Sequence, residues 1–241
     1  MNAAQQGTPA DVTKCAYAHL APRLNPDRWV SGATPDRERG MKTNRWNHNL
    51  HYHPLILAAA PAHCARALDV GCGDGVLTRA LRAVSDRVVG IDRDSPSIES
   101  ARAQGGEGVA YVLGNFLEHQ FQPASFDLVA SVAALHHMDA EVGLTRMSSL
   151  VRPGGALVVV GLAQSRQLGD FALDLAGAVA TRVYTHILRK RYWEHDAPKV
   201  WPPPLSYAEV RATAARLLPG VKYRRHVLWR YSLVWIRPRS E

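Results

Sequence analysis

Cysteine is scarce in this sequence of 241 residues, which contains only Cys15, Cys64 and Cys72. Three cysteines at these spacings form neither a disulfide framework nor the Cys-x-x-Cys pair that is typical of zinc sites. Reduced thiols are the simplest interpretation, and they favour a cytoplasmic protein.

Long apolar runs are absent as well. No segment reaches the roughly 18 consecutive apolar residues that a membrane-spanning helix needs. Residues 1–13 are small and polar, unlike the basic and apolar start of a secretory signal. We therefore expect a cytoplasmic protein without a membrane segment, and its 46% hydrophobic residues are enough for a full globular core.

Acidic residues are few in the last third of the chain. Residues 163–241 contain 14 Lys and Arg but 6 Asp and Glu, so the whole net charge of +8 arises there. A basic surface can attract an acidic partner such as RNA. Because most of these charges are dispersed, a solvated and solubilising face is the favoured interpretation, and nucleic-acid binding is the less favoured one.

Short apolar segments alternate with helical patterns in the middle of the chain. Buried strands are predicted over 67–70, 87–92, 109–113, 126–133 and 156–162, with helices over 76–84, 96–103 and 140–151. Ser95 is the expected N-cap of the second of these helices. Apolar strands that alternate with helices indicate a doubly wound parallel sheet, covered on both faces.

The two flanks of this core follow other patterns. Residues 1–60 are predicted to form an irregular, proline-containing arm and a short cap helix, and residues 61–241 the main domain. Within the domain, residues 163–205 interrupt the alternation. There an apolar residue recurs every fourth position from Phe171 to Ile187, which predicts an amphipathic helix packed against the domain or against a second copy.

The end of the chain returns to regular patterns. A helix is predicted over 207–218, with Ser206 as its N-cap, followed by strands over 221–228 and 231–236. These two strands are close enough in sequence to form a hairpin.

A glycine-rich turn follows the first strand, in Asp69-Val70-Gly71-Cys72-Gly73-Asp74-Gly75. Glycine lets the backbone approach a ligand closely, and the next helix directs its N-terminal amides toward that ligand. Two carboxylates strengthen this signal. Asp69 stands at the end of a buried strand, where a carboxylate is costly unless it has a role. Asp92 ends the second strand, where it can accept hydrogen bonds from both hydroxyls of a ribose.

Five motifs in order resemble those of class I S-adenosylmethionine-dependent methyltransferases. They are Asp69–Gly75, Gly90-Ile91-Asp92, Gly114-Asn115-Phe116-Leu117, Phe126-Asp127-Leu128-Val129 and Leu150-Val151-Arg152-Pro153-Gly154-Gly155. The resemblance implies a Rossmann-like, seven-stranded sheet whose last strand is antiparallel, with residues 163–205 as a helical lid. A dinucleotide-dependent dehydrogenase fits less well, because the third glycine of its turn would come one residue later.

The resemblance also implies a site for S-adenosylmethionine, with S-adenosylhomocysteine as the product. The glycine turn would line the methionine part and Asp92 would hold the ribose. Asn115 and Phe116 would contact the adenine; many relatives have Asp in place of Asn115, whose carbonyl is still an acceptor. The full predicted cofactor set is Asp69, Gly71, Cys72, Gly73, Gly75, Asp92, Arg93, Asn115, Phe116 and Ser131.

The methyl acceptor is expected beyond the carboxyl ends of the fourth and fifth strands, where α/β sheets bind ligands. His136 and His137 follow the fourth strand, and one of them can be the base that a hydroxyl acceptor requires. The alternative is a structural role at the strand end. Adjacent residues point apart, so at most one of the two is expected to face the methyl group. The Leu-His-His run resembles methyltransferases of small metabolites, quinones and natural products.

Two segments are candidates for the acceptor pocket. A polar and aromatic run before the core either covers the site or begins a helix, with Asn47 or Asn49 as N-cap. Aromatic residues of the 163–205 insertion either line the pocket or pack the lid onto the sheet. The predicted substrate-binding residues are Trp46, His48, His51, Tyr192 and Trp193. No metal site is predicted, because the histidines of the first segment have no Cys or acidic neighbour.

The sequence thus predicts methyl transfer to a small molecule by a monomer or homodimer, with oxygen favoured over nitrogen as the acceptor. Two alternatives belong to other classes. An RNA methyltransferase predicts tight binding to RNA that weakens steeply with salt. A non-catalytic module predicts S-adenosylmethionine binding without turnover.

Overall fold

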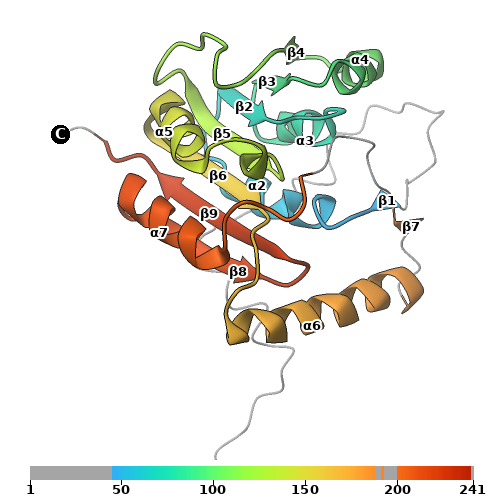
Figure 1. The fold of residues 1–241 in the computed structure, drawn as a ribbon. Helices are drawn as coiled ribbons and strands as arrows, with labels where there is room; N and C mark the ends of the chain where they lie inside the picture. The colour runs from blue at the N-terminus through green and yellow to red at the C-terminus, as the bar shows by residue number, and fades with distance from the viewer. Residues whose placement is uncertain (1–44, 188–190, 193–199, 240–241) are drawn as a thin grey trace, which may run out of the picture. The chain divides into compact units, whose positions relative to one another are not determined.

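A seven-stranded sheet forms the centre of the computed structural model, which describes residues 45–187, 191–192 and 200–239 (Figure 1). The strand order is β4-β3-β2-β5-β6-β9-β8. The strands are β2 (Arg66–Val70), β3 (Arg87–Asp92), β4 (Val109–Leu113), β5 (Phe126–Val132), β6 (Val151–Gly161), β8 (Lys222–His226) and β9 (Arg230–Ile236). Strand β9 is antiparallel to β6 and β8, whereas β2 to β6 are parallel. The predicted fold class is confirmed.

Helices cover both faces of this sheet. They are α2 (His53–Ala58), α3 (Val76–Ala80), α4 (Ser95–Gln104), α5 (Ala140–Leu150), α6 (Leu168–Arg182) and α7 (Tyr207–Leu217). One core cluster joins the sheet to α5 and α7 through Met147 and Val210, and a second joins it to α2 and α3 through Ile56 and Leu77. None of the helices within the described residues is long and apolar enough to cross a lipid bilayer.

Short turns complete the fold and position the ends of the strands. They are the 3₁₀ turns η2 (Leu50–Tyr52), η3 (Leu81–Ala83) and η4 (Leu135–His137), and the π-helical turn η5 (Val183–Ile187). A separate two-stranded parallel sheet pairs β1 (Arg45–Trp46) with β7 (Arg191–Tyr192), so that Trp46 lies beside Tyr192.

Side-chain caps fix where two of the helices begin. The Asp94 carboxylate accepts a hydrogen bond from the Ser97 amide at 3.0 Å, so Asp94 is the N-cap of α4 and the prediction of Ser95 was one residue late. Ser206 caps α7 as predicted, because its hydroxyl accepts the Glu209 amide while the Glu209 carboxylate accepts the Ser206 amide.

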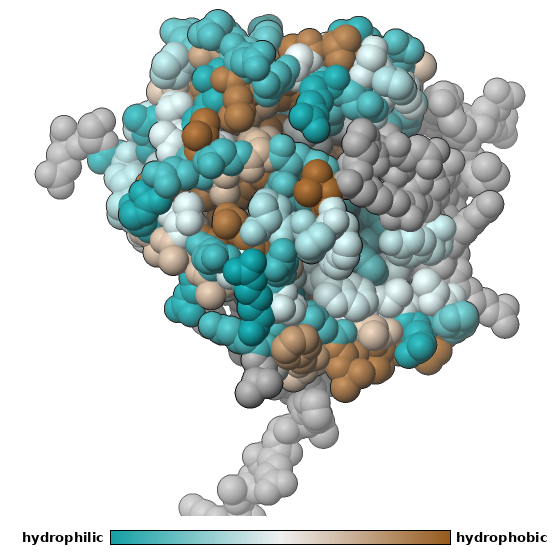
Figure 2. Space-filling model, viewed as in Figure 1, coloured by the Kyte–Doolittle hydropathy of each residue, from teal (hydrophilic) through white to brown (hydrophobic). Residues whose placement is uncertain are grey.

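The apolar stripe of helix α6 faces outward (Figure 2), so of its two predicted partners it does not pack against the domain, and packing against a second copy stays a prediction. Four apolar residues of α6 and η5 are more than half exposed: Phe171, Leu175, Val179 and Ile187. The opposite face meets the domain instead. A Cβ added to Gly177 would lie 3.1 Å from the Leu228 nitrogen, and Asp174 pairs with Arg225 at 2.9 Å. Small and acidic residues therefore make the intramolecular contact of this helix.

Candidate cofactor and acceptor site

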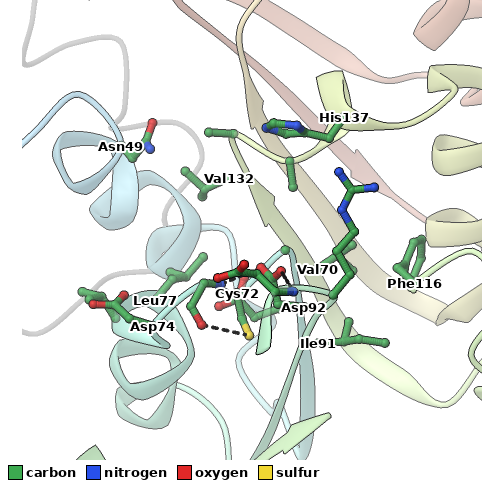
Figure 3. A pocket seen from close by; sticks show the side chains of 18 of the residues that line it. Asn49, Val70, Cys72, Asp74, Leu77, Ile91, Asp92, Phe116, Val132 and His137 are labelled. Carbon is green, nitrogen blue, oxygen red and sulfur yellow. Dashed lines mark hydrogen bonds between the residues drawn. The ribbon is translucent and has the colours of Figure 1, made fainter. Parts of the chain in front are cut away.

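A cavity of about 530 Å³ opens at the carboxyl ends of β2, β3 and β5 (Figure 3). One part of its wall comes from the glycine turn and the segments after β3 and β4. The other part comes from residues 47–53 and the segment after β5. We call these two parts the cofactor half and the acceptor half.

The glycine turn needs glycine for different reasons at two of its positions. Gly71 has φ +74°, and an added Cβ would lie 2.3 Å from Cβ of Ala134. Gly73 has φ +53°, but the space that its Cβ would enter contains no protein atom within 4 Å. Gly71 thus allows the turn to pack on the segment after β5, whereas Gly73 leaves the backbone open toward a ligand.

Asp69 and Cys72 lie beneath this turn. The Asp69 carboxylate is 1% exposed and accepts a hydrogen bond from the Thr78 hydroxyl at 2.7 Å. Burial raises the pKa of Asp69 to about 7, although the bond from Thr78 opposes that shift. Burial also raises the pKa of the Cys72 thiol, which rests against Gly90 of β3, so this thiol stays protonated.

Asp92 connects the glycine turn to the end of β3. Its Oδ2 accepts the Gly73 amide at 2.9 Å, and its Oδ1 accepts the Asp94 amide at 3.0 Å. Arg93 follows it in the wall of the cavity. The Asp92 carboxylate is therefore held at the strand end, with lone pairs left for further donors.

Asn115 and Phe116 line the cavity after β4. The Asn115 carbonyl accepts the Leu117 amide at 3.1 Å, and its amide donates to Glu118 at 2.8 Å. This side chain therefore already supports its own turn, and one carbonyl lone pair and one amide N–H remain for a ligand. Phe116 is 5% exposed and lies with its ring centroid 5.4 Å from the Arg146 guanidinium.

Two predicted cofactor residues, Gly75 and Ser131, do not line the cavity. Gly75 packs against Tyr111, whose hydroxyl would lie 2.3 Å from an added Cβ. Ser131 belongs to β5. Its side chain is fully buried within the sheet, and its hydroxyl donates to the Val70 carbonyl at 3.0 Å. The neighbouring Val132 lines the cavity instead. Successive residues of a strand point to opposite faces, so an end position can be misassigned by one.

The two histidines after β5 occupy different environments. His137 lines the cavity, whereas His136 does not, and their ring centroids are 4.1 Å apart. The backbone reaches this arrangement through Ala133, whose φ of +52° is strained for a residue with a side chain. Burial lowers the pKa of His136 to about 4, and burial followed by the charge of Arg93 lowers the pKa of His137. Both rings are therefore neutral at pH 7.

Four predicted substrate-binding residues gather in an aromatic cluster outside the cavity. Trp46 is 3% exposed and stacks on Tyr184 of η5, with ring centroids 4.7 Å apart. His48, His51 and Tyr192 surround it at 5.5, 6.3 and 6.1 Å. The cluster joins the segment before the core to α6 and β7. The fifth residue, Trp193, lies outside the described residues.

The same segment contributes a different set of residues to the cavity, and the sequence prediction missed them. They are Asn47, Asn49, Leu50 and His53. Asn49 is the N-cap position of η2 but makes no side-chain capping bond. The Asn47 side chain holds the start of this turn instead, because its Oδ1 accepts the amides of Asn49 and Leu50 at 2.9 and 2.8 Å. Positions 47, 50 and 53 are three residues apart and share one side of a helical turn, whereas 48 and 51 lie on another side. This periodicity could have found Asn47, Leu50 and His53, but it does not place Asn49.

The acceptor half contains no acidic residue among the described residues of its wall. Its titratable groups there are the imidazoles of His53 and His137. Burial lowers the pKa of His53 to about 4, so this ring is also neutral at pH 7. Within the described parts of the chain, no three His, Cys, Asp or Glu side chains gather in the way that a metal ion requires.

Known proteins resemble this chain in sequence and in fold. Residues 68–159 match the family model of a methyltransferase domain. An uncharacterized methyltransferase of Mycobacterium tuberculosis is 35% identical over 195 residues, which cover 80% of this chain and 98% of that protein. The ubiquinone biosynthesis O-methyltransferase of Methylocella silvestris is 34% identical over 125 residues, which cover 50% of this chain and 48% of that protein.

Solved structures show the same architecture. The N-methyltransferase NodS of Bradyrhizobium japonicum aligns with a TM-score of 0.53 at 15% identity, covering 78% of this chain and 96% of its own. With the strand order, the glycine turn and the match to the mycobacterial protein over nearly its whole length, the chain belongs to the class I S-adenosylmethionine-dependent methyltransferases. Its cofactor is S-adenosylmethionine.

Proposed function

We propose that this enzyme methylates an oxygen atom of a small molecule. The observation that carries the proposal is the unequal distribution of charge around the cavity. Among the described residues, its carboxylates belong to Asp69, Asp74, Asp92 and Asp94, all in the cofactor half. The acceptor half offers two neutral imidazoles and amide groups instead.

The cofactor half fits S-adenosylmethionine. The carboxylates suit a ligand with a sulfonium and an ammonium group, and Asp92 can bind ribose hydroxyls. The space beside Gly73 admits the ligand next to backbone. When bound, the cofactor supplies an electrophilic methyl group. Of the predicted contacts, we retain Asp69, Gly71, Cys72, Gly73, Asp92, Arg93, Asn115 and Phe116; we leave out Gly75 and replace Ser131 with Val132.

The acceptor half supports oxygen over nitrogen. A hydroxyl nucleophile needs a base, and His137 provides a neutral imidazole in the cavity wall. In this role its ring nitrogen removes the hydroxyl proton as the oxygen attacks. An amine acceptor is a cation in neutral water, and no acidic residue in the described wall of the acceptor half would attract it. The Methylocella relative is likewise named an O-methyltransferase.

The arginines of the basic last third support a small molecule over RNA. Arg166, Arg216 and Arg225 pair with Glu209, Glu141 and Asp174, and Arg230 is buried. Such internal pairing reduces the positive surface that could contact phosphates.

Methyl-labelled S-adenosylmethionine, incubated with the enzyme and fractionated cell extract, tests this proposal. We expect label in a small molecule, and degradation should yield it as an O-methyl group. Label in RNA would favour the RNA methyltransferase, and label on nitrogen would overturn the oxygen assignment. Cofactor binding without label in any fraction would indicate the non-catalytic module. Asp92→Ala serves as the control with weakened cofactor binding.

A further inference from the structure

Arg230 is a buried cation whose described partners are all neutral. It is 7% exposed at the start of β9. Its Nε and Nη2 donate to Oδ1 of Asn49 at 3.1 and 2.7 Å, and its Nη1 donates to the carbonyls of Leu228 and Trp229 at 3.3 and 3.2 Å. No carboxylate of the described residues pairs with it. Burial lowers the pKa of Arg230 to about 10, which still leaves it charged at pH 7.

A strained hairpin tip holds this cation in place. Between β8 and β9, Leu228 and Trp229 have φ of +62° and +54°, values that are unusual for large side chains. The Tyr52 hydroxyl donates to the Val227 carbonyl at 2.6 Å, which fastens the tip to the turn that carries Asn49. Backbone strain combined with an uncompensated buried charge destabilises the fold, and such features persist where function requires them.

The arginine also determines which way the Asn49 amide faces. A guanidinium can only donate hydrogen bonds, so the atom of Asn49 that meets it must be the carbonyl oxygen. The Nδ2 group is therefore directed away from Arg230. Asn49 lines the acceptor half, on the side of the cavity opposite His137 in Figure 3. No described residue accepts a hydrogen bond from its Nδ2.

We propose that Asn49, oriented and polarised by Arg230, binds an anionic oxygen of the methyl acceptor. Asn49 is the contact residue. Arg230 does not line the cavity and is a positioning residue that adds positive electrostatic potential at Asn49. The acceptors are then acidic small molecules, which carry a carboxylate or an ionised phenol. This inference rests on the proposed function and narrows its substrate class. Since the described wall of the acceptor half has no carboxylate, nothing there opposes an anion.

Binding to the enzyme saturated with S-adenosylhomocysteine tests the inference without turnover. The probes are benzoate and ionised 4-nitrophenol as anions, benzamide as the neutral isostere and benzylammonium as the cation. Calorimetry should show at least one of the two anions bound about tenfold more tightly than benzamide, the expected gain for a charged partner in a hydrogen bond. Which anion binds distinguishes a carboxylate from a phenolate. Equal binding of all probes, or no binding of either anion, would overturn the inference.

Asn49→Asp is the decisive variant. It gives Arg230 a carboxylate partner and replaces the donor by an acceptor, so it should raise the thermal midpoint while weakening anion binding about tenfold. Asn47→Asp is the matched control, because it adds the same charge to the same wall, can keep its capping bonds and has no bond to Arg230. It should weaken anion binding less and leave the midpoint unraised. An Asn49→Asp protein that binds the anion like wild type would overturn the inference.

Variants of Arg230 separate its charge from its geometry. Arg230→Lys keeps the charge but loses the double bond to Asn49, so its anion affinity should lie between those of wild type and Arg230→Met. Equal anion affinity in wild type and in a folded Arg230→Met protein would count against the inference. If Arg230→Met does not fold, the anion affinity of Asn49→Asp is the deciding measurement. Normal S-adenosylhomocysteine binding without anion preference would refute only this inference, whereas anion binding without methyl transfer to any acceptor would refute only the proposed function.

Discussion

The cofactor half and the acceptor half of one cavity are built in different ways. In the cofactor half, Asp92 bonds to amides of its own loop and of the adjacent glycine turn, and the turn takes its shape from glycine backbone angles. In the acceptor half, Asn49 is held by Arg230, 181 positions away in the chain. The first half is thus determined by local sequence, and the second by contacts that exist only in the folded domain.

The largest effect is expected in the acceptor half, from His137→Ala. Loss of a base should lower turnover by about 100-fold or more, with S-adenosylmethionine affinity unchanged. The base acts in its neutral form, and its pKa is lowered, so wild-type turnover should persist below pH 6.5 and decline only as pH falls through that lowered value. Steady-state rates across pH measure both effects. His136→Ala, outside the cavity, should mainly affect stability; near-normal turnover of His137→Ala would contradict the assignment.

The reverse pattern is expected in the cofactor half, from Asp92→Ala. This change removes the carboxylate at the end of β3 and two hydrogen bonds that shape the turn. The dissociation constant for S-adenosylmethionine should rise about 100-fold, as for the loss of two charged hydrogen bonds. Calorimetry measures it. Asp86→Ala, an exposed carboxylate before the other end of the same strand, is the control and should bind normally. If Asp92→Ala and Asp86→Ala bound S-adenosylmethionine equally well, Asp92 would not determine cofactor binding in the cofactor half.

The same contrast explains what the sequence could predict. Each determinant of the cofactor half lies in one strand-turn unit, so Asp69, the glycines, Asp92 and Asn115 could be located from motifs of a few residues. The parallel sheet followed from the alternation of strands and helices, and its antiparallel last strand from the resemblance to the family. These local patterns need no knowledge of distant contacts.

The acceptor half could not be predicted in that way. Trp46 was selected for its residue type, but the rotation of the turn directs it to Tyr184 and directs Asn49 to the cavity. The partner of the α6 stripe was left open for a related reason, since periodicity identifies an apolar face but not what covers it. Nothing in the sequence indicated a role for Arg230. That role depends on the hairpin tip, which contacts the turn at residues 49–52 only in the folded domain.

Within the cofactor half, Gly71→Ala should mainly lower stability, whereas Gly73→Ala should mainly weaken cofactor binding. A methyl group at position 71 would collide with Cβ of Ala134, so we expect the free energy of unfolding to fall by about 2–4 kcal/mol. At position 73 the methyl meets open space, and the strained φ alone should cost about 1 kcal/mol. Gly73→Ala should therefore fold but bind S-adenosylmethionine more weakly. Denaturant titration and calorimetry distinguish the two, and equal stability losses would disprove the contrast.

The smallest effect is a difference in how the two halves respond to acid. His53 of the acceptor half and the neighbouring His136 have pKa values lowered by burial to about 4, so their proton uptake favours unfolding. Stability should then fall as pH decreases from about 6.5 toward 4, because the unfolded chain takes up these protons first. Asp69 in the cofactor half has the opposite sign, because its pKa is raised to about 7 and its contribution is lost as pH rises from about 4 to 7. Thermal unfolding of the ligand-free protein between pH 4 and 7.5 measures the sum. His53→Asn should reduce the loss of stability at acid pH, and Asp69→Asn should increase that loss. If both variants shifted the stability profile in the same direction, the two halves would not respond to acid with opposite signs.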